Sequence, residues 1–164
     1  MVDGSTIGST AGGDQVTGTI ELLVIAPESG AAVELPQAVE ALAGRGLAGD
    51  RYCLTEAATG RAAKGNITLI ERASFDHLRS LGLGVEEHEL RRNVVVSGLD
   101  LNQLVGSEFT IGSVRCLATE LCEPCRQIER LTHDGVLKAL VGRGGIRAEI
   151  LSGGLISIGD SVAG

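Results

Sequence analysis

The fold class is decided by residues 108–119, EFTIGSVRCLAT. The segment 108–111 is rich in aromatic and β-branched residues, and it predicts a strand that ends at Gly112. In residues 114–119, Val, Cys and Ala alternate with Arg, Leu and Thr. Alternation at every second position is typical of a strand with one buried face. This second predicted strand leads the chain directly to Cys122.

Similar short segments lie on both sides of this stretch. Further strands are predicted at residues 19–25, 36–43, 66–70, 93–96, 146–151 and 155–158, and short helices after residue 70 up to Gly82 and at 86–90, 127–131 and 135–141. The segment 36–43 also fits a short helix, but we favour a strand. Many short strands, few helices and glycine-rich joints predict a mainly β fold, a closed or nearly closed β-barrel with small helices packed outside.

Composition agrees with one domain of this kind. A chain of 164 residues that is 43% hydrophobic can bury a core without disulfides or a structural metal. Aromatic residues make up only 2%, so Val, Leu, Ile and Ala must fill that core, and the 24 glycines indicate many turns. We expect residues 1–16 to be a flexible tail and residues 17–164 to form the domain.

The tail is made of Gly, Ser, Thr and Asp without an apolar run, so the sequence predicts neither a secretory signal nor a membrane-spanning helix. We therefore expect a cytoplasmic protein, in which the four cysteines stay reduced. The net charge of -7 argues against nucleic acid or an anionic membrane as the main partner. Arginine is strongly favoured over lysine, which fits two-point pairing with phosphate or carboxylate but also a simple codon bias.

The motif with most chemistry is Cys122-Glu123-Pro124-Cys125-Arg126. A C-x-x-C pair suits metal, persulfide or redox chemistry. The thiolate of Cys125 could ligate a soft metal such as molybdenum or carry sulfane sulfur, and Arg126 favours that thiolate. Cys122 is either a second sulfur site that resolves a persulfide or a spectator. The alternative for Cys125 is a buried structural thiol.

Several further motifs occur in a fixed order along the chain. They are Gly46-Leu-Ala-Gly-Asp-Arg51, Arg91-Arg92-Asn93, Gly98-Leu99 with Leu104-x-Gly106, the cysteine Cys125, and Gly153-Gly154 with Ile158-Gly159-Asp160. In this order they resemble the MOSC domain, which is named for the C-terminal domain of molybdenum cofactor sulfurases and also occurs as small stand-alone bacterial proteins. The resemblance covers roughly residues 18–163. Arg92 departs from it, because relatives often have another residue there.

The resemblance implies a MOSC barrel, similar to the pyruvate kinase barrel, and a pterin molybdenum cofactor or a persulfide held at Cys125, with Cys125 as the metal ligand. The activity would be sulfur transfer or reduction of N-oxygenated compounds. The protein would then be a molybdenum-dependent oxidoreductase or a sulfur carrier that serves a sulfurtransferase. The chain is too short for a pyridoxal-phosphate domain, so any sulfur donor must come from outside. The sequence shows no flavin or iron–sulfur site, so an electron donor would have to be a separate protein.

The same resemblance suggests which residues hold the cofactor. Arg51 and Arg91 would hold the pterin and its phosphate, because arginine donates to anions in a bidentate manner. Asn93 would donate to ligand carbonyls, or else cap the entry of a strand. Asp50 would orient Arg51 or cap a turn.

Two other functions remain open at this point. One is a non-catalytic binding module whose cysteines are incidental. The other is a zinc-stabilised barrel that uses Cys116, Cys122, Cys125 and His133 as a Cys₃His set, although the spacing is irregular. Otherwise we interpret Cys116 and Cys53 as packing residues.

Arg147 is a third candidate to hold the pterin and its phosphate, but neither Arg147 nor Arg143 lies in a motif. We interpret both as solvated or salt-bridged surface residues.

Overall fold

A computed structural model describes residues 16–63 and 65–164, and all but the last residue of the predicted tail lie outside this range. Ten strands are described: β1 (Thr17–Leu23), β2 (Ala38–Leu42), β3 (Gly46–Leu47), β4 (Ile67–Glu71), β5 (Val94–Ser97), β6 (Glu108–Ile111), β7 (Val114–Leu121), β8 (Ile146–Ser152), β9 (Gly154–Ser157) and β10 (Ser161–Ala163). The α-helices are α1 (Arg72–Ser80), α2 (Arg126–Leu131) and α3 (Val136–Ala139), and the 3₁₀ helices are η1 (Gly60–Ala63), η2 (Glu87–Leu90) and η3 (Leu101–Leu104).

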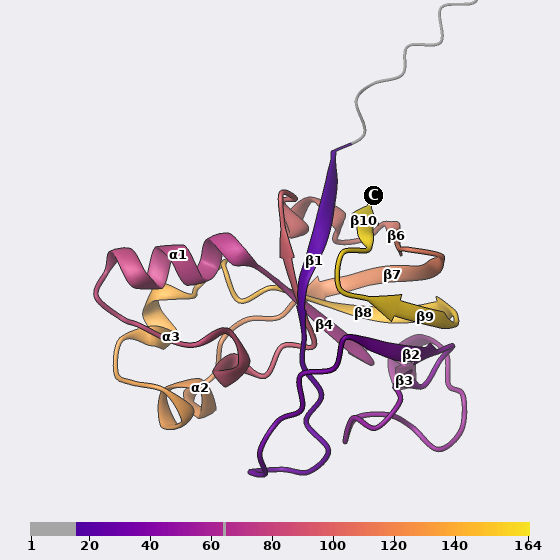
Figure 1. Cartoon of the computed structure of the whole chain (residues 1–164), viewed down its shortest axis with the longest axis horizontal. Helices are drawn as coiled ribbons and strands as arrows, with labels where there is room; N and C mark the ends of the chain where they lie inside the picture. Colours follow the sequence, from indigo (N-terminus) through magenta and orange to yellow (C-terminus); the bar gives the residue numbers. More distant parts are fainter. Residues whose placement is uncertain (1–15, 64) are drawn as a thin grey trace, which may run out of the picture.

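Seven strands close into a barrel in the order β1-β10-β6-β7-β8-β4-β5, with β5 pairing back to β1. The pairing of β4 with β5 is parallel and the others are antiparallel. A parallel pair needs a crossover, and α1 lies in that connection. A smaller sheet, β3-β2-β9, lies beside the barrel. The three α-helices lie together on one side of the barrel (Figure 1). The predicted β-barrel with short peripheral helices is confirmed.

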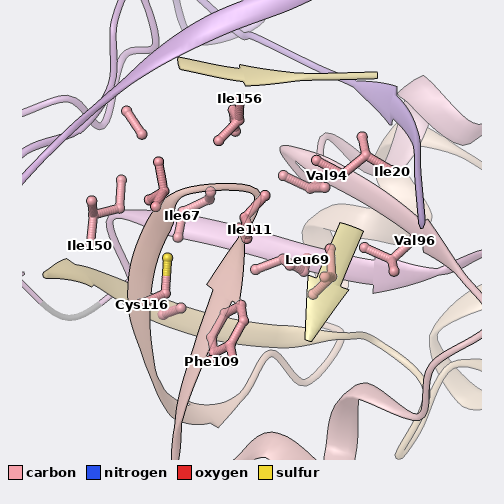
Figure 2. Packing of buried hydrophobic residues seen from close by; sticks show 14 of the residues in the cluster. Ile20, Ile67, Leu69, Val94, Val96, Phe109, Ile111, Cys116, Ile150 and Ile156 are labelled. Atoms are coloured by element: carbon pink, nitrogen blue, oxygen red, sulfur yellow. The ribbon is translucent and has the colours of Figure 1, made fainter. Parts of the chain in front are cut away.

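The barrel interior is filled almost entirely by aliphatic side chains. Ile20, Ile67, Ile111 and Ile150 point into it, with Phe109 among them (Figure 2). The alternation in residues 114–119 is confirmed, because Val, Cys and Ala of β7 are buried in this cluster. With few aromatic residues available, the interior depends on close packing of β-branched side chains.

Strand β5 differs from β7 because both of its faces are buried. Val94 and Val96 face the barrel interior, whereas Val95 packs with Phe75, Leu78 and the other residues of a second cluster beneath the helices. A strand covered on both faces has a continuous apolar run instead of an alternating pattern. The helices therefore cover the outer face of β4 and β5, and this layer forms one border of the site described below.

Most predicted elements are found, with a few differences in type. Residues 36–43 contain the strand β2, as favoured, while the predicted helix at 86–90 is the 3₁₀ helix η2. The strands β3 and β10 were not predicted, because two or three residues are too few to show a periodic pattern. No helix in the described part of the chain is long and apolar enough to cross a bilayer.

Glycine allows the C-x-x-C loop to lie against the start of β8. The N–H of Cys122 donates to the carbonyl of Gly145 at 2.7 Å. A Cβ at Gly144 would lie 2.3 Å from the carbonyl oxygen of Cys122, and one at Gly145 would lie 2.0 Å from that of Leu69. Any larger residue would push this loop away from the barrel, so the two glycines fix the position of the cysteines.

Candidate functional site

All six residues predicted to form the site meet in one cavity of about 320 Å³. We call it the arginine cavity. Its walls are Ala26, Asp50, Arg51, Tyr52, Gly65, Thr68, Leu90, Arg91, Arg92, Asn93, Cys122, Cys125, Gln127, Ile128, Leu131 and Arg147. These residues come from loops after β1 and β3, from β4 and β8, from the residues before β5 and from α2 with the C-x-x-C loop.

The cavity lies on the outer face of the barrel wall, and strand alternation explains this. Thr68 of β4 and Arg147 of β8 are cross-strand partners, and both line the cavity. Their neighbours Ile67, Ile146 and Ala148 point into the barrel interior. Because successive side chains of a strand point to opposite faces, the same two strands supply both the core and the floor of the cavity.

Arg51 has a hydrogen-bond donor without a partner. Its guanidinium carbon lies 4.6 Å from the ring centroid of Tyr52, and its Nη2 donates to the Tyr52 hydroxyl at 3.0 Å. Its Nε is buried and has no hydrogen-bond partner in the described part of the chain. Leaving a buried charged donor unpaired costs free energy, so this nitrogen indicates a missing acceptor.

Arg91 shows the same feature and also a strained backbone. Its Nη2 donates to the carbonyl of Ala31 at 2.7 Å, while its Nη1 is buried without a partner among the described residues. Its φ is 55°, the one positive φ of a described residue other than glycine. This left-handed residue interrupts the alternation expected of an extended chain, so that Arg91, Arg92 and Asn93 all reach the cavity.

Arg92 is a cavity residue that the sequence indicated only as a departure from the family pattern. Its Nε donates to the carbonyl of Gly144 at 2.9 Å and its Nη2 to that of Cys122 at 3.4 Å. Burial lowers the pKa of Arg92, and the nearby Arg147 lowers it further, whereas the thiolates of Cys122 and Cys125 act in the opposite direction. Arg92 therefore holds the C-x-x-C loop and places a positive charge near its two sulfurs.

Arg147 is the partly exposed, salt-bridged residue that the sequence analysis favoured, and it also lines the cavity. Its side chain is 42% exposed, and its Nε lies 3.8 Å from Glu120. The signal that could have placed it was its position between Ile146 and Ala148, on the outer face of a predicted strand. Arg143, by contrast, is exposed and lines a different hollow with Glu71 and Asp100.

Asp50 and Asn93 form a buried network that joins the walls of the cavity. The Asp50 carboxylate accepts from the N–H groups of Ala26 at 3.0 Å and Tyr52 at 3.1 Å, and from the Asn93 amide at 3.4 Å. The Asn93 amide also donates to the carbonyl of Val24 at 3.2 Å, and its oxygen accepts from the N–H of Thr68 at 3.0 Å. These contacts use the polar groups of both residues to hold Arg51 and the strand ends in place.

The two cysteines of the C-x-x-C motif differ in exposure. Cys122 is 1% exposed and Cys125 is exposed, and both line the cavity. Cys125 is the residue before α2, and its carbonyl accepts the N–H of Ile128 at 2.9 Å. An accessible thiol therefore lies on the same wall as a buried one, close to the positive charge of Arg92.

The zinc hypothesis is wrong for the described residues. No group of three or more His, Cys, Asp or Glu residues in that part of the chain could hold a metal. Cys116 points into the barrel interior beside Phe109 (Figure 2), and the ring of His133 is hydrogen-bonded to the carbonyl of Gly84 at 2.7 Å. Cys53 is half-buried and lies outside the cavity walls, which agrees with a packing role.

The cavity combines four guanidinium groups with two thiols inside a protein whose net charge is -7. Arginine binds phosphate and carboxylate through planar, charge-assisted hydrogen bonds. The donor set therefore suits an anionic ligand, and the exposed thiol of Cys125 suits a soft metal or sulfane sulfur at one side of it.

Known proteins give a consistent picture of the fold. The structure of the YuaD protein from Bacillus subtilis matches this chain with a TM-score of 0.76 and 20% identity. The match covers 91% of this chain and 96% of the YuaD chain. YiiM from Geobacillus stearothermophilus matches over 89% of this chain and 74% of its own, with a TM-score of 0.63 and 13% identity. YiiM from Escherichia coli matches over 88% of this chain and 68% of its own, with a TM-score of 0.63 and 15% identity.

A search of curated protein sequences finds no significant match. The sequence profile of the MOSC domain, however, matches residues 56–163, about two thirds of the chain. The matched region contains Arg91, Asn93 and Cys125 and most of the barrel, whereas the first of the motifs, residues 46–51, lies before it. The chain belongs to the MOSC domain family.

Proposed function

We propose that the arginine cavity binds a pterin molybdenum cofactor, with the thiolate of Cys125 as a ligand of molybdenum, for sulfur transfer or for reduction of N-oxygenated compounds. The observation that carries this proposal is the pair of buried, unpartnered donors, Arg51 Nε and Arg91 Nη1, in the cavity that also contains Cys125. An anionic ligand would supply the missing acceptors.

The residues of the cavity fit this cofactor by their chemistry. Its phosphate is an acceptor for the guanidinium groups of Arg51 and Arg91, and a thiolate is a suitable ligand for molybdenum. The volume of about 320 Å³ lies at the lower end of small-molecule sites, which run from about 300 to 1,000 Å³. When bound, the cofactor would supply redox chemistry at the metal, and the protein would supply binding and orientation.

The remaining residues would act by positioning. Asp50 and Asn93 already use their polar groups within the protein, so their role would be to hold Arg51 and the strand ends. This differs from the direct ligand contact that the resemblance suggested for Asn93. Arg92 would hold the loop that carries Cys125, through its hydrogen bonds to the carbonyls of Gly144 and Cys122.

A sulfur-carrier role is favoured by one further observation. Cys122 and Cys125 both line the cavity, one buried and the other exposed. A persulfide formed on Cys125 by an external donor could pass its outer sulfur to an acceptor, and the remaining thiol of Cys125 would be regenerated. Such a role needs a separate sulfur-donor protein, whereas reduction needs a separate electron-transfer protein. Both partners and the cytoplasmic location stay predictions.

Metal analysis after anaerobic purification from a host that makes molybdenum cofactor tests the proposal. We expect molybdenum in the wild type and its loss in Cys125→Ser. The matched control is Cys53→Ser, which removes a thiol outside the cavity and should retain the metal. Equal molybdenum in wild type and Cys125→Ser would refute metal ligation by Cys125. Molybdenum-free protein with labile sulfur on Cys125 would support the sulfur carrier instead.

A further inference from the structure

A second hollow, of about 360 Å³, adjoins the arginine cavity. We call it the apolar groove, and it is lined by Ala32, Val33, Leu35, His88, Glu89, Arg91 and Leu131. Arg91 and Leu131 line both hollows, so the two share a wall. The groove lies between the loop that precedes β2, the 3₁₀ helix η2 and the end of α2.

The groove exposes apolar side chains that the core does not require. Leu35 is 49% exposed and Leu131 is 39% exposed, and both are among the few large apolar residues on the described surface. Tyr52, which is 62% exposed, lies in the wall of the adjoining cavity. Apolar side chains gathered around a concave site are typical of ligand-binding sites, whereas scattered ones need no explanation.

Arg91 connects the polar and the apolar parts of this surface. Its Nη2 is held by the carbonyl of Ala31, the residue before the apolar wall at Ala32 and Val33, and its Nη1 still lacks a partner among the described residues. A guanidinium has five N–H donors, so Arg91 can donate to the cofactor phosphate and also to the polar head of a molecule whose apolar tail lies along Ala32, Val33 and Leu35.

We propose that the apolar groove is a subsite for the apolar substituent of a small amphiphilic substrate, whose polar head lies beside the cofactor at the border of the arginine cavity, where Arg91 and Leu131 line both hollows. This inference rests on the proposed function, because it needs the cavity to accept the head group. It adds that the substrate carries an alkyl or aryl group, which Val33, Leu35 and Leu131 remove from water. The occupant is a small soluble molecule, because the groove shares Arg91 and Leu131 with the arginine cavity and its tail must be continuous with a head group there.

Binding of inorganic phosphate and of a series of n-alkyl phosphates to the full chain tests the inference. The chain has one tyrosine and no tryptophan, so tyrosine fluorescence reports on Tyr52 in the wall of the cavity. Calorimetry gives an independent affinity. In the wild type we expect affinity to rise by up to about fourfold for each added methylene group and to level off when the groove is full.

Two variants locate the tail in the groove. Leu35 and Val33 line the groove but not the arginine cavity. In Leu35→Ser and in Val33→Ser, the affinity for alkyl phosphates should therefore rise less steeply with alkyl chain length, while the affinity for inorganic phosphate stays unchanged. The matched control is Leu155→Ser, an exposed leucine on β9 that lines neither hollow. It should keep the wild-type dependence on chain length.

The outcomes separate this inference from the function on which it rests. If inorganic phosphate binds but the affinity for alkyl phosphates does not change with alkyl chain length, the groove is not a subsite, while the anion site stands. An unchanged dependence on chain length in both groove variants would place the tail elsewhere and overturn the inference. If neither phosphate nor its esters bind, the anion site of the proposed function fails and the subsite fails with it.

Discussion

The barrel interior and the arginine cavity lie on opposite faces of the same strands, yet they differ in the polar groups that they contain. In the interior, aliphatic side chains surround Cys116, and burial raises the pKa of this thiol to about 12. Among the described residues, three buried side-chain atoms lack a hydrogen-bond partner: Arg51 Nε and Arg91 Nη1 belong to the cavity, and Asn66 Oδ1 lies outside its walls. Such atoms are rare in native proteins, so the two in the cavity favour a ligand there.

The largest expected difference between the two regions is in thiol reactivity. Under native conditions iodoacetamide should modify the exposed Cys125, whereas the buried Cys116 should react only after unfolding. Peptide mapping by mass spectrometry measures both. Modification of Cys116 as fast as Cys125 would mean that the barrel interior opens readily.

The raised pKa of Cys116 also predicts an alkaline limit to stability. The unfolded chain releases this proton near the ordinary value of 9.0, and the folded chain only near 12. Stability should therefore fall as the pH rises through this window. Urea denaturation at several alkaline pH values measures the free energy of unfolding. This free energy should fall less steeply with pH in Cys116→Ala than in the wild type.

Truncation in the interior should have the next largest effect. Ile111→Ala removes a fully buried side chain and should lower the free energy of unfolding by about 2–5 kcal/mol. Urea denaturation measures this loss, and Leu155→Ala on the exposed face of β9 is the control. A loss below about 1 kcal/mol would mean that the interior can collapse around the deletion.

Truncation in the cavity should instead affect binding. Arg51→Ala should weaken phosphate binding by about 10- to 100-fold, the value of a charge-assisted hydrogen bond, with little loss of stability. Calorimetry measures the affinity, because the variant also disturbs the ring contact with Tyr52. Arg143→Ala, which lies outside the cavity, is the matched control. Equal affinities in the two variants would contradict an anion site at Arg51.

A smaller effect should separate two substitutions at one cavity residue. Arg91→Gly and Arg91→Ala both remove the guanidinium, but only glycine adopts a φ of 55° without strain. We expect Arg91→Gly to be more stable than Arg91→Ala by about 1 kcal/mol in urea denaturation. Equal stabilities would show that the backbone relaxes at this position once the side chain is removed.

The smallest effect is expected at Glu87, which lies outside both regions. Burial raises its pKa, but hydrogen bonds and the charges of Arg79 and Arg72 outweigh this, so the pKa is lowered from 4.5. Its contribution is therefore present above pH 4.5 and is lost as the pH falls through the lowered value. Glu87→Gln should lower stability at neutral pH by less than about 1 kcal/mol, because water screens the pair. The free energies of unfolding of the wild type and of Glu87→Gln should converge as the pH is lowered, and a constant difference between them would contradict this prediction.

Local patterns predicted much of this fold because they depend on neighbouring residues. The alternation in residues 114–119 and the run before Ser97 predicted β7 and β5, and glycine predicted many of the turns. The 3₁₀ character of η2 and the strands β3 and β10 were not predicted. Those segments are short, and pairing with distant strands decides their conformation.

By itself, the sequence determined the fold class and the family, and it named Cys125, Arg51 and Arg91 as candidate site residues, since they lie in motifs whose residue types are visible locally. Only the tertiary structure decided that Arg92 and Arg147 join them, that Asn93 is used within the protein, and that an apolar groove adjoins the cavity. The physical reason is barrel closure: it brings together side chains far apart in the chain, and the register of β4 with β8 decides which of them face the same side.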